Sequence, residues 1–363
     1  MKIKYITISA ILALGMSVGG CGNNQTQAGT SAKELSMEDL TSQLSEGILD
    51  GKSEITCTYQ GKANDLNKKV NEELESYLAE DYLCNNLLDS VNIEWEQQGA
   101  EASGTFTFVY KEDVELPIIN AKNEDEIVNG LVEGWESGKE KITVILENQS
   151  YEKDEIFAML DGAEINSASI PCEADNVYFE TFKPEGELQI LKMWVDLGTD
   201  RASLQEEQDA LNQMIQTYGD EIKSAEYGSE EEMYRAIYRK VVDIAEYDDS
   251  IAVVTGMERL SFQMRVLRSA YGALVDGNTV CTGYARGYKA LCDYLELPCQ
   301  VVAGIRNDVK HSWNRVKIGE KYFYVDCTAG DTGNTEEEAC LFTQEQMDQS
   351  GYIMDDGYVI PEI

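Results

Sequence analysis

The chain has 363 residues, of which 43% are hydrophobic and 26% are charged, a composition typical of soluble globular proteins rather than of disordered or multi-span membrane proteins. Its formal net charge is -38, and no segment concentrates Lys and Arg. Nucleic-acid binding requires a basic face that neutralises phosphates, so nucleic acid is excluded as an expected partner. The same acidity argues against a basic amphipathic helix lying on anionic lipid.

The first twenty residues have the pattern of an export signal. Residues 1–4 carry two lysines, and residues 6–14 form an apolar stretch that is too short to span a bilayer as a mature helix. Residues 18–20, Val-Gly-Gly, precede Cys21. This arrangement resembles the lipobox of bacterial lipoproteins, in which the Cys is lipidated and becomes the new N-terminus. The alternative interpretation is an ordinary secretory signal with an incidental Cys.

The lipobox resemblance implies a location for the protein. Residues 1–20 are then a lipoprotein signal peptide, and the polar residues 21–35 form a tether. We expect the protein on the extracytoplasmic face of the cell membrane, lipid-anchored at Cys21. Several acyl chains on one Cys would hold it firmly, and contact with the membrane would be through this anchor only.

The other cysteines form no recognisable disulfide or metal pattern. Nine Cys in an exported chain would ordinarily suggest disulfides. Without Cys21 and the nucleophile candidate Cys281, however, an odd number without regular spacing remains, and no pair has the separation of two to four residues typical of zinc ligands. We therefore expect buried free thiols and no metal site. These residues are Cys57, Cys84, Cys172, Cys292, Cys299, Cys327 and Cys340.

Residues 36–122 and 123–200 are predicted to form two small α+β modules related by a weak internal duplication. Leu44-Ser45-Glu46-Gly47 recurs as Leu131-Val132-Glu133-Gly134, an offset of 87 residues. Each copy is expected to hold a strand, a helix and two further strands. In the first copy these are Glu54–Tyr59, Leu66–Leu83, Val91–Glu96 and Thr105–Tyr110. In the second copy they are Ile142–Glu147, Asp154–Leu160, Val177–Phe182 and Leu188–Val195.

A polar linker helix over 201–225 is predicted to lead into a last domain, residues 226–363. This domain opens with a capping box, because Ser229 is followed three residues later by Glu232. Apolar residues then recur at helical spacing and predict a helix that ends near 247–249. They are Tyr234, Ile237, Tyr238, Val241 and Ile244.

Cys281 is predicted to lie at the first turn of another buried helix. Free N–H groups and the positive end of the helix dipole favour a thiolate at such a position, and the same groups can stabilise an oxyanion. A thiol at a helix start is also common as a purely structural residue. The helix is predicted from apolar residues at intervals of four, three and four, namely Tyr284, Tyr288, Leu291 and Leu295.

His311 is the only histidine of the chain, and a Cys nucleophile needs a base of this kind. The strand-like runs Asn314–Ile318 and Lys321–Val325 flank Gly319-Glu320, which suits a type II′ hairpin turn. The resulting register places Asp326 opposite Trp313, on the face that carries His311 two residues further on. Asp326 is then within reach of the imidazole, whereas a slip of one residue would separate them. The alternative is that Asp326 only ends a strand.

These residues resemble the transglutaminase-like superfamily, in particular its bacterial secreted members. The resemblance covers about residues 227–345 and implies an α+β papain-like core, in which the Cys-bearing helix packs on an antiparallel sheet. It rests on ordered motifs, which are Val280-Cys281-Thr282-Gly283-Tyr284-Ala285, Leu297-Pro298-Cys299, Val302-Ala303-Gly304, His311-Ser312-Trp313-Asn314 and Tyr324-Val325-Asp326-Cys327-Thr328.

The resemblance also implies the chemistry of a thiol enzyme. Cys281 would be the nucleophile, His311 the general base and then acid, and Asp326 the residue that holds the His311 tautomer. An acyl group from a peptide, protein or cell-wall peptide would pass through a thioester to an amine or to water, without a cofactor or metal. One departure is that the related pattern often continues after Thr328 with Trp and an acidic pair, whereas this chain has Ala329-Gly330-Asp331. An altered cleft or substrate choice would follow.

Two other functions compete with a cell-surface enzyme. The domain could be a catalytically silent module that binds cell wall or a protein partner, although binding alone does not require Cys, His and Asp together. Metal storage through the cysteines is a third possibility, and no ligand spacing supports it.

Overall fold

The computed structural model describes residues 32–147, 150–167, 177–182, 188–195, 201–225, 227–249 and 262–363. The expected signal peptide, Cys21 and Cys172 lie outside the described residues. Nowhere in the described ranges is a helix long and apolar enough to cross a membrane. The contacts divide the chain into two units, one of residues 1–120, 143–147 and 182–192, the other of residues 121–142, 148–181 and 193–363.

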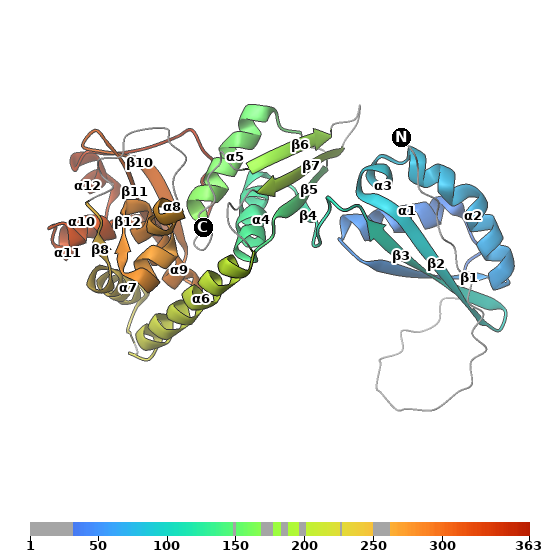
Figure 1. Cartoon of the computed structure of the whole chain (residues 1–363), viewed down its shortest axis with the longest axis horizontal. Coiled ribbons are helices and arrows are strands. Elements are labelled where there is room, and N and C mark those ends of the chain that lie inside the picture. Colours follow the sequence, from blue (N-terminus) through green and yellow to red (C-terminus); the bar gives the residue numbers. More distant parts are fainter. Residues whose placement is uncertain are drawn as a thin grey trace. The chain divides into compact units, whose positions relative to one another are not determined.

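In the first unit, helices pack on a three-stranded antiparallel sheet (Figure 1). The strand order is β1-β3-β2, with β1 at Glu54–Gln60, β2 at Leu88–Gln98 and β3 at Glu101–Tyr110. Every second residue from Ala102 to Phe108 is buried, as the alternating pattern of β3 predicts. The helices are α1 (Met37–Leu49), α2 (Ala63–Glu80) and α3 (Tyr82–Leu87).

The single helix predicted over 66–83 is wrong, because the chain breaks between α2 and α3. Asp81 has an extended backbone (φ -68°, ψ 126°), and its carboxylate accepts a hydrogen bond from the backbone N–H of Cys84 at 2.8 Å. Asp at this position is a strong helix N-cap, so it starts a new helix rather than continuing the old one.

A second set of elements follows the same order. Helix α4 (Glu124–Glu136) and strand β5 (Lys141–Glu147) have the bounds of α1 and β1 shifted by 87 residues. They are followed by α5 (Lys153–Asn166), β6 (Val177–Phe182) and β7 (Leu188–Val195). The sheet order β4-β5-β7-β6 contains the β1-β3-β2 pattern and adds β4 (Ile119–Ala121) beside β5. The shared offset of 87 residues for the first helix and the first strand fits the predicted internal duplication, which stays a prediction.

The C-terminal residues form a five-stranded antiparallel sheet of order β13-β12-β11-β10-β14. Its bounds are β10 at Cys299–Arg306, β11 at Val309–Ile318, β12 at Lys321–Val325, β13 at Cys340–Phe342 and β14 at Tyr352–Met354. The predicted hairpin register is confirmed, because Ile318 pairs with Lys321 and Asn314 with Val325. Gly319 has a φ of 58° while Glu320 does not have a positive φ, which fits a type II′ turn.

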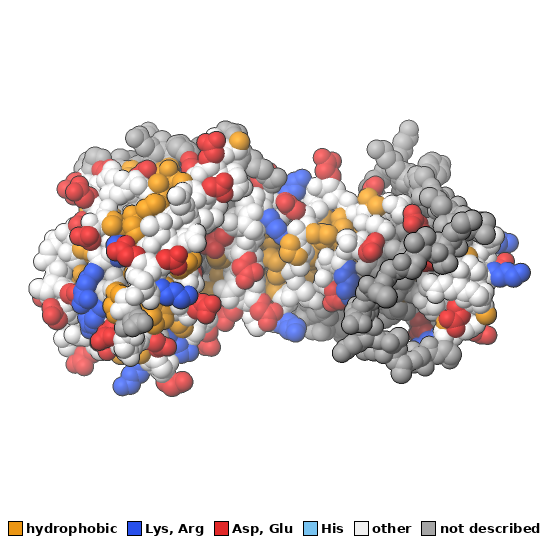
Figure 2. All heavy atoms as spheres, turned by 90° about the horizontal axis from the view of Figure 1, so that it is seen from below, with side chains coloured by type: hydrophobic (Ala, Val, Ile, Leu, Met, Phe, Trp, Pro, Cys, Tyr) orange, Lys and Arg blue, Asp and Glu red, His pale blue; other side chains and the backbone are white. Residues whose placement is uncertain are grey.

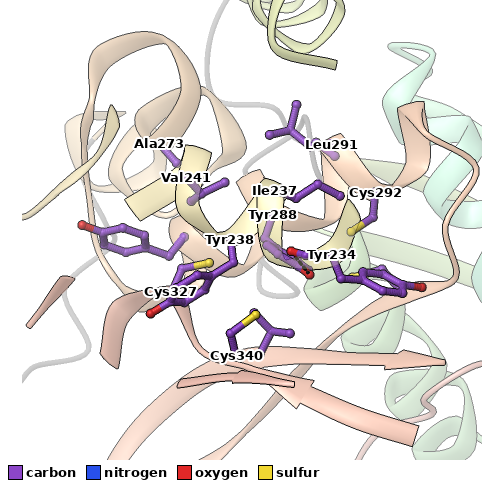
Figure 3. Packing of buried hydrophobic residues seen from close by; sticks show 14 of the residues in the cluster. Tyr234, Ile237, Tyr238, Val241, Ala273, Tyr288, Leu291, Cys292, Cys327 and Cys340 are labelled. Atoms are coloured by element: carbon purple, nitrogen blue, oxygen red, sulfur yellow. Dashed lines mark hydrogen bonds between the residues drawn. The ribbon is translucent and has the colours of Figure 1, made fainter. Parts of the chain in front are cut away.

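One face of this sheet is covered by helices that share a hydrophobic core. Helix α9 (Cys281–Tyr294) starts at Cys281 as predicted, and α7 (Glu230–Ile244) starts after the predicted N-cap Ser229. Figure 3 shows Ile237 and Val241 of α7 beside Tyr288 and Leu291 of α9. The fold is therefore mixed α+β, with the Cys-bearing helix packed on an antiparallel sheet.

Further short elements complete this part of the chain. The helix expected over 201–225 is α6 (Arg201–Lys223), which buries Leu211 and Ile222 in the same core as α7 and α9. A parallel pair joins β8 (Glu246–Tyr247) to β9 (Asn278–Thr279). The remaining elements are α8 (Phe262–Leu267), η2 (Gly272–Asp276), α10 (Cys327–Asp331), α11 (Glu336–Ala339) and α12 (Gln344–Gln349).

Acidic side chains dominate the visible charge of the described surface. In Figure 2 they are spread over the face shown, and Lys and Arg form no broad patch on it. On this face the acidic charge is therefore distributed rather than concentrated in one patch.

Candidate active site

Cys281 is held at the start of α9 by close packing around the first helical turn. Val280 is the extended N-cap, and the Thr279 hydroxyl donates to the carbonyl of Leu267 at 2.7 Å. A Cβ at position 283 would lie 1.9 Å from Thr279 Oγ1 and 2.6 Å from the Leu267 carbonyl oxygen, so only glycine fits there. The glycine at position 283 thus lets the first turn of α9 lie close against Thr279 and Leu267, and this contact positions the Cys281 thiol.

The residues that alternate with His311 along β11 attach the sheet to α9. Ser312 Oγ lies 3.3 Å from Thr282 Oγ1, and Asn314 Nδ2 donates to the carbonyl of Ala285 at 2.9 Å. Both Ser312 and Asn314 are buried. Because successive strand residues point to opposite faces, His311 and Trp313 lie on the face of β11 opposite to Ser312 and Asn314. In the His-Ser-Trp-Asn motif, Ser312 and Asn314 therefore contact α9, and His311 and Trp313 form part of the site.

Asp326 connects His311 to the helix that follows β12. Its Oδ2 lies 2.8 Å from His311 Nε2, and its Oδ1 accepts from the backbone N–H of Ala329 at 2.9 Å as the N-cap of α10. The Asp326 side chain is fully buried and the His311 side chain is 11% exposed. With Nε2 engaged by Asp326, Nδ1 is the ring nitrogen left for Cys281, which is close enough to His311 to raise the pKa of the imidazole.

Aromatic rings limit the motion of the imidazole. The His311 ring stacks on Trp313 at a centroid distance of 6.0 Å and an angle of 20°, and it lies 6.2 Å from the Tyr352 ring at an angle of 51°. These contacts favour one orientation of the ring over free rotation.

The electrostatics favour an imidazolium beside a thiolate. Burial alone would lower the pKa of His311, but its hydrogen bonds to Asp326 and Cys281 outweigh burial and raise that pKa to about 9. Burial alone would raise the pKa of Cys281, yet the hydrogen bond and charge of His311, with the Ser312 backbone N–H, lower it overall. The pKa of Asp326 is lowered in the same way, since His311 outweighs the effect of burial.

The other described cysteines have a different character. All seven described cysteines are free thiols. Cys281 is partly exposed, and the other six are buried. Burial raises the pKa of five of them, Cys57, Cys84, Cys292, Cys327 and Cys340. In the described part of the chain, no cluster of three or more His, Cys, Asp or Glu side chains is placed to hold a metal ion.

Two residues in contact with Asp326 were missed by sequence reasoning. Tyr352 donates its hydroxyl to Asp326 Oδ2 at 2.6 Å, and Arg306 Nη1 lies 3.4 Å from the same oxygen. Neither has a spacing that relates it to the three predicted residues. Tyr352 depends on the pairing of β14 with the distant β10, and Arg306 lies at the end of β10, next to the turn into β11.

The departure from the related pattern after Thr328 has a local reason. A Cβ at Gly330 would lie 2.0 Å from the Tyr238 hydroxyl oxygen, so this position has no room for a side chain. Asp331 Oδ2 accepts instead from the Tyr284 hydroxyl at 2.8 Å, which links α10 to α9.

The histidine pKa can be measured on its own, because the chain has one His. In an NMR titration of the folded protein, the imidazole signal should show a midpoint near 9 instead of the ordinary 6.5. Asp326→Asn should move the midpoint down, since the anion that stabilises the imidazolium is lost while burial remains. Asp331→Asn, a neighbouring carboxylate without contact to His311, is the control. A wild-type midpoint at or below 6.5 would contradict the ion pair.

One part of the chain matches a known protein family. Residues 216–327 match the family model of the transglutaminase-like superfamily, and this range contains Cys281, His311 and Asp326. No curated protein matches the chain. Among solved structures, the chain is similar to a TGase at 14% identity and a TM-score of 0.29, over 68% of this chain and 65% of that one.

A second similar structure is that of a proposed cysteine protease from Cytophaga hutchinsonii, at 13% identity and a TM-score of 0.27, over 49% of this chain and 65% of that one. The chain thus spans 65% of the length of each of these two proteins, and likenesses this weak say nothing about activity. Residues 216–327, which include the Cys-bearing helix, His311 and Asp326, are thus the part of the chain that is similar to the transglutaminase-like superfamily.

Proposed function

We propose that the C-terminal domain is a thiol enzyme that transfers or hydrolyses acyl groups of peptide or amide substrates. The observation that carries this proposal is the position of His311, whose Nε2 lies 2.8 Å from Asp326 Oδ2 and which is close enough to Cys281 to lower the pKa of that thiol. Its members come from α9, β11 and the end of β12, and a structural role for any one of them would not require the other two.

The first half of the reaction forms a thioester. The Cys281 thiolate bonds to the carbonyl carbon, and the C–N bond breaks as the His311 imidazolium delivers its proton to the leaving amine. The N–H groups of the first turn of α9 lack partners within the helix and can donate to the oxyanion. The lowered pKa of Cys281 supports this role, since the thiolate is the nucleophilic form.

The second half regenerates the enzyme. An amine or a water molecule attacks the thioester, gives its proton to His311, and Cys281 leaves as the thiolate. Asp326 remains ionised throughout and holds His311 in the orientation that both steps need. An amine acceptor makes the domain a cross-linking enzyme, and water makes it a peptidase or amidase.

A thiol probe tests the proposal without knowledge of the substrate. Near neutral pH, iodoacetamide should alkylate Cys281 much faster than any other described cysteine, because its pKa is lowered and its thiol is partly exposed, while the other thiols are buried and burial raises the pKa of five of them. His311→Ala should abolish this preference, and mass spectrometry locates the label. Equal labelling of several cysteines in the folded wild-type protein would refute the enzyme and favour a silent binding module.

The acceptor can be identified with natural material. We propose cell-wall peptide as the acyl donor, and isolated cell wall with a labelled primary amine is the assay. Incorporation of the amine indicates transfer, and release of small fragments indicates hydrolysis. A matched Cys281→Ala protein should do neither. Equal activity of that variant would show that Cys281 is not the nucleophile.

We also propose that the enzyme acts outside the cell, anchored by lipid at Cys21. The sequence pattern of residues 1–21 supports this proposal. Full-length protein produced in bacteria should incorporate a labelled fatty acid and fractionate with membranes, and Cys21→Ser should lose both properties. Labelling that persists in Cys21→Ser would overturn the assignment.

A further inference from the structure

Asp326 Oδ2 has more donors than a catalytic carboxylate requires. It lies 2.8 Å from His311 Nε2, 2.6 Å from the Tyr352 hydroxyl and 3.4 Å from Arg306 Nη1. Its Oδ1 is already used by Ala329 N–H at the start of α10. Both oxygens of this fully buried carboxylate are therefore engaged, and two of the donors have no part in the proposed reaction.

Tyr352 and Arg306 act as one structural unit. They are direct cross-strand partners between β10 and β14, and the Arg306 guanidinium lies 4.9 Å from the centroid of the Tyr352 ring. Tyr352 is buried, and its ring contacts Trp313 at 5.1 Å and Phe342 at 5.4 Å. This packing fixes the direction of the hydroxyl and, through the cation–π contact, the position of the guanidinium.

Strand β14 lies beyond the range that matches the family model, which ends at residue 327. It is an edge strand of three residues that pairs with β10. Its first residue, Tyr352, is the one that reaches Asp326. A short C-terminal strand thus contributes directly to the surroundings of the proposed catalytic residues.

We infer that Tyr352 and Arg306 are positioning residues that keep Asp326 ionised and oriented toward His311. This inference rests on the proposed function and adds to it a part of the machinery outside the matched range. The two residues touch neither the nucleophile nor the reacting carbonyl. They act through Asp326 and then His311 on Cys281.

The physical reason is the cost of burying a carboxylate. A buried anion without donors takes up a proton, whereas charge-assisted hydrogen bonds keep it ionised. The other titratable groups beside Asp326 in the described residues are Tyr238 from α7 and Cys327 from α10, and burial keeps both neutral by raising their pKa. Next to Cys281, Tyr247 from β8 is likewise kept neutral. The charge of Asp326 thus depends on its four donors, which are His311, Tyr352, Arg306 and the backbone N–H of Ala329.

Loss of either Tyr352 or Arg306 should first affect Asp326, then His311 and finally Cys281. Without one of these fixed donors, Asp326 Oδ2 is no longer held in the orientation that faces His311 Nε2, so the imidazolium loses part of its stabilisation. A less stabilised imidazolium in turn stabilises the Cys281 thiolate less. The pKa of Cys281 therefore rises. Packing damage alone would slow the enzyme or unfold it, but would leave this titration in place.

The test compares two tyrosine variants. Tyr352→Phe removes the hydroxyl on Asp326, and Tyr358→Phe removes one that accepts from the Ala303 N–H at 2.6 Å. Both tyrosines are buried and both contact β10 or its partners. The rate of Cys281 alkylation by iodoacetamide is measured against pH by mass spectrometry. Tyr352→Phe should raise the midpoint by about one pH unit and lower the rate about 10-fold below that midpoint. Tyr358→Phe should match the wild type.

A matched arginine pair repeats the test independently and covers the case in which Tyr352→Phe does not fold. Arg306→Gln should raise the midpoint as well. Arg315→Gln is its control, because Arg315 also lies over a tyrosine ring, 4.7 Å from the centroid of Tyr322, but bonds Gln300 at 2.9 Å instead of Asp326. In Tyr352→Phe/Arg306→Gln the shift should differ from the sum of the single shifts, since both donors share one oxygen.

The outcomes separate the two proposals. A wild-type Cys281 no more reactive than the other thiols overturns the proposed function and this inference with it. A reactive wild-type Cys281 whose midpoint stays unchanged in both Tyr352→Phe and Arg306→Gln overturns the inference alone. Equal shifts in Tyr358→Phe or Arg315→Gln would also overturn it, because they would show a general response to lost packing.

Discussion

The contact between a buried carboxylate, Asp326, and the only histidine of the chain is the interaction on which this domain depends. Asp326 lies 2.8 Å from His311 and is inaccessible to solvent, so its charge must be balanced by donors that the fold supplies. The raised pKa of His311 and the lowered pKa of Cys281 are two consequences of that balance. Without the anion, the largely buried imidazole would be neutral near neutral pH and the thiol would stay protonated.

The architecture serves to keep this arrangement in place. Gly283 lets the start of α9 approach the segment around Leu267, and Asn314 ties the same helix to β11. Asp326 is also held in place because its side chain caps the N-terminus of α10. Cys281 and Asp326 thus lie at the starts of helices, and His311 lies on a strand. In each case a neighbouring residue with a structural role holds that helix or strand in place. Such support from packed elements is what a preorganised site requires.

Much of the site could be predicted from the sequence because its geometry is local. The turn at Gly319 sets the register of one hairpin, and that register decides whether His311 and Asp326 share a face. The start of α9 at Cys281 follows from helical spacing within fourteen residues. In the N-terminal half, the strands and the repeated order of elements were likewise visible as short periodic patterns.

The parts that could not be predicted depend on long-range pairing or on competing local signals. Tyr352 reaches Asp326 because β14 pairs with β10, some fifty residues earlier, and no pattern in residues 352–354 indicates that partner. The break at Asp81 was missed because the apolar spacing continues across it while the carboxylate caps a new helix. Helix α6 looked like a polar linker, since only a narrow face with Leu211 and Ile222 is buried.

The most direct measurement of the account is the ultraviolet absorbance of the thiolate, recorded against pH as the difference between wild-type protein and Cys281→Ala. The account predicts a thiolate that titrates below the ordinary thiol value of 9.0 and that shifts upward when His311 is replaced by Ala. A difference spectrum that titrates at or above 9.0, and that is unaffected by the loss of the imidazole, would contradict it.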